Sequence, residues 1–364
     1  MNTRLFIVEQ YISWNGHYKK YFENLISEDY YYIYTAEHKQ NYPNATFIPA
    51  LKKEKSPNFL SFIKGRFLQS YTAYNKLIQH KPDAAHLIEF EPFSFLYLLL
   101  FKSDQIPKLV ITVHSIERMK YANKLKDLVS IIQRRIYGYT LNKAASRGAL
   151  FVTHYQHHKD QLVKLLGDEY SDAITLIPYP CPKPRTKINL KKDITNKKLL
   201  IYGQIREDKG IYEFLSKPGT EKLHITIAGP VLDPRILLFK NHNITFYNRY
   251  FNEEDDDLKQ LIDSHSFMLL PYIKSYTGGS GTLKDSISFG LPIIASDIPT
   301  FREVIQQGQV GYIFDSIEDI VKYTETVDQV QYDVLVENCL KYSGKYNWDY
   351  MRQQYFNIYN RFKQ

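Results

Sequence analysis

Glycine and hydroxyl side chains gather in one short stretch, YTGGSGTLKDSISFGLPIIASD, which runs from Tyr276 to Asp297. Its first three glycines leave the backbone uncluttered, so amide groups can approach an anion closely. A helical pattern begins near Thr282, and the first turn of a helix presents unpaired N–H groups and the positive end of the helix dipole. An ordinary flexible loop with a Ser/Thr helix cap is the alternative. The stretch predicts a phosphate-binding loop made of Gly278, Gly279, Ser280, Gly281 and Thr282.

A cationic pair lies in a second loop, YGQIREDKG, which follows a strand-like run in the same half of the chain. Gly203 opens this loop, and Arg206 and Lys209 stand on neighbouring positions if the turn is helical. A guanidinium fork and an ammonium both suit a diphosphate, although a solvated surface pair is the alternative. Because ligands of parallel α/β sheets bind beyond the carboxyl ends of the strands, the two loops together predict a two-sided diphosphate site.

Short apolar runs alternate with helical patterns along the chain, which predicts two doubly wound α/β domains with parallel sheets. The strand-like runs are RLFIVEQ, YYYIYT, AHLIEF, KLVITVH and ALFVTH in the first half, and KLLIYGQ, HITIAGP, ITFYN, SFMLLPY and LPIIASD in the second. A proline-rich segment, IPYPCPKPR, cannot be the interior of a strand or helix and separates the halves. We expect an N-terminal domain over 1–180, a linker over 181–197, a second domain over 198–345 and a C-terminal amphipathic helix over 346–364.

The net charge of +8 fits nucleic acid, an anionic membrane or a phosphate-bearing ligand as partner. No nucleic-acid-binding motif is visible, and we expect no such partner. Residues 118–147 hold eight Lys or Arg and one acid, with apolar side chains at helical spacing. This pattern predicts a basic amphipathic helix, which either lies on an anionic membrane surface or packs on the core with a solvated basic face.

The cysteine count and the apolar runs bear on the compartment. Two cysteines, Cys181 and Cys339, are too few for a disulfide framework and indicate a reducing compartment. No signal-peptide pattern is visible, and the longest apolar run, 94–101, is far shorter than the roughly 20 residues of a spanning helix. We therefore expect a cytoplasmic protein, bound peripherally to the inner face of the cell membrane if the basic helix is a membrane helix.

The order of these motifs resembles the large GT-B glycosyltransferase family often called family 4, the glycosyl transferases group 1. The resemblance rests on YGQIREDKG, IAGP, SFMLLPY, the glycine-rich loop, DSISFGLPIIASDIPTFREVI and GQVGYIFD, which cover most of residues 198–320. GHYKKY and TVHS extend it more weakly into the N-terminal half. It implies a GT-B fold, two Rossmann-like domains facing a central cleft, closed by a helix that starts near Trp348 and packs on the N-terminal domain.

The resemblance implies donor-binding residues by position. The family usually has two Glu, separated by seven residues, ahead of a Gly-x-Pro, and in this sequence they map to Thr277 and Asp285. Asp285 keeps a carboxylate for the ribose hydroxyls, whereas Thr277 lacks the charge that contacts the donor sugar. Gln204 stands where the family often has an Arg, a charge that Arg206 can supply, and Lys209 matches the family Lys.

Further residues are implied around the cleft. His114 ends the strand-like KLVITVH, and the resemblance places it near the donor diphosphate or sugar; a strand-end histidine bonded to the backbone is the alternative. Gly16 and His17 lie in the first strand-to-helix loop, on the acceptor side. Tyr250 and Pro230 follow strands near the expected base pocket.

Two clusters have metal-binding residue types without a fitting pattern. Residues 253–257 contain a D-x-D, but they open a helical pattern, where acids favour the dipole. His154, His157 and His158 have no Cys or carboxylate partner at ligand spacing. We expect no metal and no cofactor.

Together the motifs and the resemblance predict a metal-independent glycosyltransferase with His114, Arg206 and Lys209 as its catalytic residues. It would move a sugar, with retention of configuration, from a nucleoside-diphosphate donor (UDP or GDP) to a saccharide or lipid-linked saccharide, in bacterial surface polysaccharide or cell-wall glycan assembly. Inversion is the alternative outcome, and it would need a base on the N-terminal domain, with His17 or His114 as the candidates. The alternatives are a nucleotide-sugar epimerase of the same shape and a nucleotide-sugar-binding scaffold without activity, which Thr277 and Gln204 favour. A dinucleotide oxidoreductase is disfavoured because no G-x-G-x-x-G follows the first strand of either half.

Overall fold

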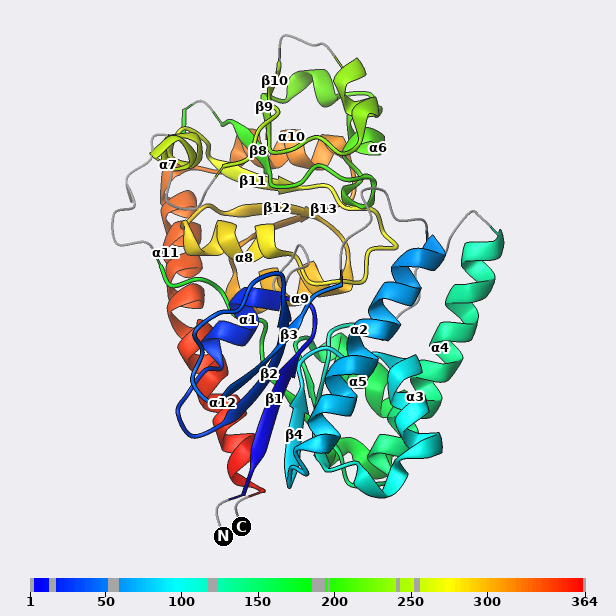
Figure 1. Ribbon diagram of the computed structural model, residues 1–364. Helices are drawn as coiled ribbons and strands as arrows, with labels where there is room; N and C mark the ends of the chain where they lie inside the picture. The colour runs from blue at the N-terminus through cyan, green and yellow to red at the C-terminus, as the bar shows by residue number, and fades with distance from the viewer. Residues whose placement is uncertain are drawn as a thin grey trace. The chain divides into compact units, whose positions relative to one another are not determined.

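The chain is described as a computed structural model that covers residues 3–12, 18–51, 59–116, 124–184, 194–195, 197–239, 243–251 and 256–362. It divides into two compact units. Unit 1 comprises Met1–Pro178 and Met351–Gln364, and unit 2 comprises Tyr179–Tyr350. Each unit holds one parallel sheet between helices, which confirms the predicted doubly wound α/β class (Figure 1).

Unit 1 is built on a seven-stranded sheet with the order β3-β2-β1-β4-β5-β6-β7. Its strands are β1 Leu5–Glu9, β2 Tyr31–Ala36, β3 Ala45–Pro49, β4 Ala84–Leu87, β5 Lys108–Val113, β6 Leu150–Thr153 and β7 Ile174–Leu176. Its helices are α1 Tyr18–Asn24, α2 Phe59–Gln79, α3 Pro92–Phe101, α4 Lys124–Ala145 and α5 Gln156–Leu166. Every residue of β1 and β4 is buried, as expected for central strands covered on both faces. The strand order reverses between β1 and β4, which places a switch point there.

Helix α12 (Trp348–Asn360) completes unit 1 through a buried chain of hydroxyl and imidazole groups. The Tyr359 hydroxyl lies 2.6 Å from His86 Nδ1, and the Tyr355 hydroxyl lies 2.7 Å from Thr112 Oγ1. Thr112 Oγ1 also lies 2.8 Å from His86 Nε2. Tyr355 contacts the Tyr21 hydroxyl of α1, so α1 and α12 cover one face of the sheet while α2 to α5 cover the other (Figure 1).

Unit 2 has a six-stranded sheet with the order β10-β9-β8-β11-β12-β13. Its strands are β8 Leu199–Tyr202, β9 Ile225–Ala228, β10 Ile244–Tyr247, β11 Phe267–Leu270, β12 Ile293–Ser296 and β13 Gly311–Phe314. Its helices are α6 Ile211–Leu215, α7 Asp256–Asp263, α8 Gly281–Ser288, α9 Pro299–Gly308, α10 Ile317–Thr326 and α11 Gln329–Lys345. The order reverses between β8 and β11, so the two loops predicted to bind a diphosphate both leave this switch point.

The predicted basic helix is α4, and part of its apolar stripe reaches the surface. Leu128 and Ile132 are 54% and 45% exposed, whereas Val129 and Ile136 are half-buried. The apolar run 94–101 lies in α3, which begins at Pro92 after its N-cap Glu91. Within the described part of the chain, no helix is both long enough and apolar enough to cross a membrane.

His86 makes the stability of unit 1 depend on acid. Burial, and to a lesser extent His114, lowers the pKa of His86 to about 3, while an unfolded histidine titrates near about 6.5. Between these values the unfolded chain binds the extra proton, so stability falls as the pH drops, by at most about 1.4 kcal/mol per pH unit. Urea unfolding from about pH 7.5 to about pH 5 should show this slope.

The substitution His86→Gln should flatten the slope, because it removes the group that titrates. His38→Gln, at an exposed histidine, is the control and should leave the slope unchanged. An equal slope in the wild type and His86→Gln would rule out His86 as its cause.

Candidate functional site

The two predicted loops of unit 2 meet through a buried lysine. Lys209 is 5% exposed, and its Nζ donates to the Tyr202 carbonyl and to Thr282 Oγ1, both at 3.3 Å. Tyr202 ends β8, and Thr282 lies in the first turn of α8. The structure thus brings the YGQIREDKG loop and the start of the helix after the glycine-rich loop into direct contact.

Gly203 allows the close approach of these two loops. Its φ of 92° is in the left-handed region, and an added Cβ would lie 3.1 Å from Thr282 Oγ1 and 3.4 Å from Lys209 Nζ. A side chain at this position would therefore be strained and would also press on the buried lysine.

The glycine-rich loop ends in a capped helix, as the alternative interpretation of this loop also predicted. Ser280 is the N-cap of α8, and its Oγ accepts from the Leu283 amide at 3.2 Å. The Tyr272 hydroxyl lies 3.0 Å from the same Oγ, and the Lys209 ammonium lies 5.6 Å from the Tyr272 ring centroid. Tyr276 donates to the Gly279 carbonyl at 2.8 Å. Hydrogen bonds from two tyrosines therefore fix the loop in front of the helix.

Arg206 is held by a neighbouring acid. Its Nε and Nη2 donate to the two carboxylate oxygens of Asp208 at 3.0 and 2.9 Å. Burial, the largest single effect, lowers the pKa of Arg206, but the hydrogen bonds to Asp208 and its charge, together with Tyr276 and Tyr272, raise the pKa overall. A phosphate would therefore have to share this guanidinium with Asp208, whereas Lys209 has only neutral oxygen partners among the bonds described.

The other predicted donor residues of unit 2 differ in how deeply they are buried. Asp285 lies half-buried in α8, one turn after the first residue of the helix, and Thr277 is half-buried in the loop before it. Pro230 follows β9 and is half-buried. Tyr250 is 67% exposed, and its hydroxyl accepts from Gln204 at 3.4 Å.

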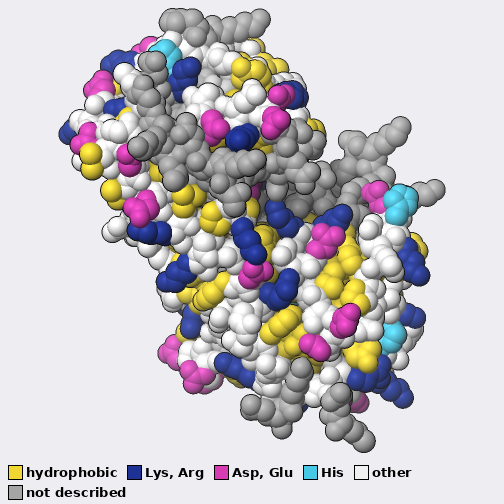
Figure 2. Space-filling model, turned by 90° about the vertical axis from the view of Figure 1, so that its left-hand side faces the viewer, with side chains coloured by type: hydrophobic (Ala, Val, Ile, Leu, Met, Phe, Trp, Pro, Cys, Tyr) yellow, Lys and Arg dark blue, Asp and Glu magenta, His cyan; other side chains and the backbone are white. Residues whose placement is uncertain are grey.

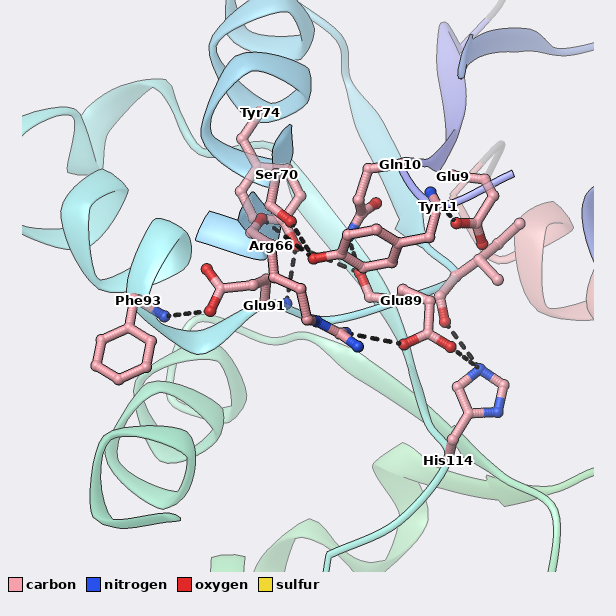
Figure 3. Close-up of polar contacts among 11 residues, drawn as sticks. Glu9, Gln10, Tyr11, Arg66, Ser70, Tyr74, Glu89, Glu91, Phe93 and His114 are labelled. Carbon is pink, nitrogen blue, oxygen red and sulfur yellow. Dashed lines mark hydrogen bonds and ion pairs between the residues drawn. The ribbon is translucent and has the colours of Figure 1, made fainter. Parts of the chain in front are cut away.

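A polar cluster that the sequence analysis missed occupies the switch point of unit 1 (Figure 3). Val8 of β1 pairs with Leu87 of β4, so the residues after them lie side by side. The Gln10 side-chain amide donates to the Glu89 carbonyl at 2.8 Å. Glu9 Oε1 accepts from the Tyr11 amide at 2.7 Å. Two carboxylates thus lie at the carboxyl ends of neighbouring strands.

Glu89 joins two basic side chains. Its Oε2 lies 3.7 Å from Arg66 Nη2, and its Oε1 lies 3.2 Å from Nε2 of His114. Arg66 also lies over the Tyr11 ring, 4.3 Å from its centroid, and the Tyr11 hydroxyl lies 2.6 Å from Ser70 Oγ. Arg66 and Ser70 both come from α2, so this helix positions the guanidinium.

Burial shifts the acids of this cluster toward their neutral forms. Burial, followed by repulsion from Glu89, raises the pKa of Glu9 well above its usual value. Burial likewise raises the pKa of Tyr11 to about 12. Among the described residues, Glu9 Oε2 and Gln10 Oε1 have no hydrogen-bond partner, and both atoms are buried. Fully buried polar atoms of this kind are uncommon in folded proteins and require a physical reason.

His114 lies at the same edge, directly after β5. Its Nε2 also lies 3.1 Å from the Ile88 carbonyl, as the alternative interpretation of a backbone-bonded histidine predicted. The rings of Tyr21 and His154 pack on it at centroid distances of 5.6 and 5.2 Å. The predicted acceptor residues Gly16 and His17 lie outside the described residues.

The two clusters considered for metal binding have other contacts. Residues 253–255 lie outside the described residues, while Asp257 lies in the first turn of α7 and forms an ion pair with Arg249 at 2.6 Å. His154 Nδ1 lies 2.8 Å from the Ile177 carbonyl, and His157 Nε2 lies 2.9 Å from Gln161. Within the described ranges, no group of three or more His, Cys, Asp or Glu side chains could hold a metal ion.

Gly203→Ala tests the close approach in unit 2. The left-handed backbone and the two short contacts should lower the free energy of unfolding by about 1–2 kcal/mol. Gly65→Ala in α2 is the matched control, because an added Cβ there meets open space and should raise stability by about 0.5–1 kcal/mol. Urea unfolding of both variants measures the difference, and a neutral Gly203→Ala would contradict the described geometry.

Comparison with known proteins gives a family match for part of the chain and similar solved structures for its fold. Residues 196–330 match the family model of the glycosyl transferases group 1. A search of curated proteins gave no match. Sucrose-phosphate synthase from Thermosynechococcus elongatus has a similar structure, with a TM-score of 0.74 at 11% identity over 99% of this chain and 98% of that one.

Two further solved structures are similar to this chain in fold. HepE from Anabaena, solved with UDP-glucose, gives a TM-score of 0.65 at 12% identity over 98% of this chain and 99% of its own. A glycosyltransferase from Rickettsia africae gives 0.68 at 13% identity over 100% and 99%. At these identities the likeness is one of fold, and the family match identifies the second unit. The chain is a glycosyltransferase of the GT-B fold that carries a glycosyl transferases group 1 domain at residues 196–330.

Proposed function

We propose that unit 2 binds a UDP-sugar and that the enzyme transfers its sugar, without a metal ion and with retention, to a saccharide or lipid-linked saccharide bound by unit 1. The contact of Lys209 with Thr282 carries this proposal, because it presents an ammonium and the first turn of α8 at one switch point. A diphosphate is the ligand that this combination of charge and amides suits best.

Catalysis by this site is mainly stabilisation of the leaving group. As the bond between the sugar and the diphosphate breaks, negative charge grows on the β-phosphate. Lys209 and the amides of 279–282 are preorganised to meet this charge, and each such donor can contribute about 3–4 kcal/mol to the transition state. Arg206 would be a further donor to the β-phosphate when its guanidinium binds phosphate instead of Asp208.

Uracil is the proposed base of the donor nucleotide because similar structures were solved with UDP-sugars. HepE was solved in complex with UDP-glucose, and an Escherichia coli trehalose-6-phosphate protein was solved with UDP-2-fluoro glucose. Asp285 is proposed to orient the ribose, and Thr277 to lie near the transferred sugar. Retention would follow from attack on the face that the diphosphate leaves, with the departing phosphate taking the proton of the acceptor hydroxyl.

We further propose that the acceptor is lipid-linked and lies at the inner face of a cell membrane, in surface polysaccharide or cell-wall glycan assembly. The exposed side chains of helices α3 and α4 support this part of the proposal. Large apolar side chains are exposed on both helices, namely Leu100, Phe101, Leu128, Ile132 and Tyr139. Arg134 and Arg135 are exposed on α4 among them. On the left-hand side of Figure 1, Lys and Arg are interspersed with Asp and Glu, and groups of hydrophobic side chains lie among them (Figure 2). We therefore propose α3 and α4 as the surface that meets anionic lipid.

Nucleotide binding tests the donor site. In a thermal-shift panel of UDP, GDP, dTDP, ADP and CMP, UDP at about one hundred times its Kd should add about 2.7 kcal/mol of stability, and EDTA should not change this. Lys209→Met keeps the length of the side chain but removes the charge, so UDP should bind at least about tenfold more weakly. Lys217→Met, at an exposed lysine after α6, is the control. A flat panel with folded protein, or unchanged binding in Lys209→Met, would refute the site.

Vesicle flotation tests the membrane surface. The wild type should float with anionic vesicles at low salt and not with neutral ones. Each basic residue near such a surface contributes about 1 kcal/mol, so the double variant Arg134→Gln, Arg135→Gln should bind roughly tenfold more weakly or worse. The double variant Lys322→Gln, Lys341→Gln in unit 2 is the control. Absence of flotation at low salt would remove this part of the proposal.

A further inference from the structure

We propose that Tyr276 is a positioning residue of the donor site, whose hydroxyl turns the peptide between Gly279 and Ser280 so that the Ser280 N–H faces the β-phosphate of a nucleoside diphosphate. The inference rests on the proposed function, because the phosphate is that of the proposed donor. It assigns a role to a side chain that the sequence analysis did not count among the donor-binding residues. It also gives one amide of the glycine-rich loop a specific partner.

The Tyr276 hydroxyl fixes the direction of one peptide group. It donates to the Gly279 carbonyl at 2.8 Å. In a trans peptide the C=O and the N–H that follows it point in opposite directions. The Ser280 N–H belongs to the same peptide as the Gly279 carbonyl, so it points away from the Tyr276 hydroxyl.

The glycine before this peptide makes such a constraint necessary. Gly279 has no Cβ, so rotation of the peptide that follows it costs little. If the peptide turned over, the Gly279 carbonyl oxygen rather than the Ser280 N–H would face the ligand. A carbonyl oxygen repels an ionised phosphate, since the oxygens of both groups can only accept hydrogen bonds. The bond from Tyr276 therefore selects the orientation that can bind an anion.

The cap of α8 leaves this N–H available. Ser280 is the N-cap residue, and its Oγ accepts from the Leu283 amide at 3.2 Å. In a complete capping box, a side chain three residues after the N-cap accepts from the N-cap amide in return. Helices α10 and α11 have this second bond, from Asp319 and Gln331. In α8 the corresponding residue is Leu283, whose side chain has no acceptor, so the cap does not use the Ser280 N–H.

Tyr276 is held by groups outside the peptide that it orients. Its amide donates to the Ile273 carbonyl at 2.9 Å, and its ring packs edge-on against Tyr272 at a centroid distance of 4.8 Å. The ring of Phe301 in α9 lies 6.5 Å away. An added Cβ on Gly278 would lie 3.2 Å from the Tyr276 hydroxyl oxygen, so a glycine there leaves room for the hydroxyl. A side chain that orients another group requires support of this kind.

The same tyrosine lies near the cation of the other predicted loop. After burial and Asp208, Tyr276 is the next influence on the pKa of Arg206, and it raises this pKa. Tyr272, whose hydroxyl lies 3.0 Å from Ser280 Oγ, follows it. The two tyrosines therefore lie where the glycine-rich loop meets the loop of Arg206, which is where the diphosphate is proposed to bind.

One variant and a matched control test the proposal. Tyr276→Phe removes the hydroxyl and keeps the ring. Tyr332→Phe is the control, because the Tyr332 hydroxyl donates to the Ser266 carbonyl at 2.9 Å, before the start of β11 and so at the opposite end of this strand from the loop. Each variant loses one bond from a tyrosine to a backbone carbonyl and should lower the melting temperature. Only Tyr276→Phe should change nucleotide binding.

The first measurement is the NMR signal of the peptide itself. Gly279 and Ser280 form the only Gly-Ser dipeptide in the sequence, so isotope labels on glycine carbonyl carbon and serine nitrogen give a single carbonyl–amide cross-peak. In the wild type UDP should shift the Ser280 amide proton downfield, because its N–H donates to phosphate, and UMP should shift it much less. Without nucleotide, Tyr276→Phe should move the Gly279 carbonyl carbon upfield, because its oxygen loses a donor, and Tyr332→Phe should not. An unchanged carbonyl signal in Tyr276→Phe would overturn the proposal.

The second measurement is the Kd for UDP and for UMP, by calorimetry. Tyr276→Phe should bind UDP about fivefold more weakly or worse, while its Kd for UMP, which has no β-phosphate, stays within about twofold. Equal weakening for both nucleotides, or none, would contradict a role toward the β-phosphate. If the wild type binds neither nucleotide, the proposed function fails and this inference fails with it. If the wild type binds UDP but its Ser280 amide does not respond, this inference alone fails.

Discussion

Glu89 can lie buried at the end of β4 because Arg66 and His114 both direct N–H groups toward its carboxylate. Removing a charge from water is costly, and the cost is met here by partners that come from different elements of unit 1. Arg66 reaches the site only because α2 crosses behind the sheet, and its ring partner Tyr11 is fixed by Ser70 of the same helix. The position of α2 and the composition of the switch point therefore depend on each other.

Unit 2 also buries a charged side chain at its switch point, but there the charge is the positive charge of Lys209. Lys209 is buried between the Tyr202 carbonyl and the Thr282 hydroxyl, so neutral oxygens surround its ammonium group. Arg206, three residues earlier, stays at the surface with an anionic partner. The charge of the buried Lys209 is therefore less compensated by protein groups than the charge of the exposed Arg206. This difference was not accessible from the sequence, where both residues occupy one short loop.

The sequence predicted the fold and the unit 2 loops well because the relevant signals are local. Buried parallel strands are continuous apolar runs, and the loops that follow them carry their polar residues within a few positions. Strands β3, β7 and β13 were not predicted. Strand β3 is half-exposed and contains Pro49, β7 has only three residues, and β13 begins with Gly311 and is buried only at Phe314. The unit 1 site had a weaker signal in the sequence, because Glu89 is an acid inside the apolar run AHLIEF, and this run predicts a strand. Arg66 had none, because only the path of α2 brings it to Glu89.

Helix α12 has a consequence for the order of folding. Its residues from Met351 onward belong to unit 1, although they follow the whole of unit 2 in the chain. During synthesis the ribosome therefore releases a continuous unit 2 while the His86 and Thr112 side of the first sheet still lacks Tyr355 and Tyr359. Unit 1 starts first but can be completed only last, and its uncovered sheet face is the surface that a nascent-chain chaperone would meet.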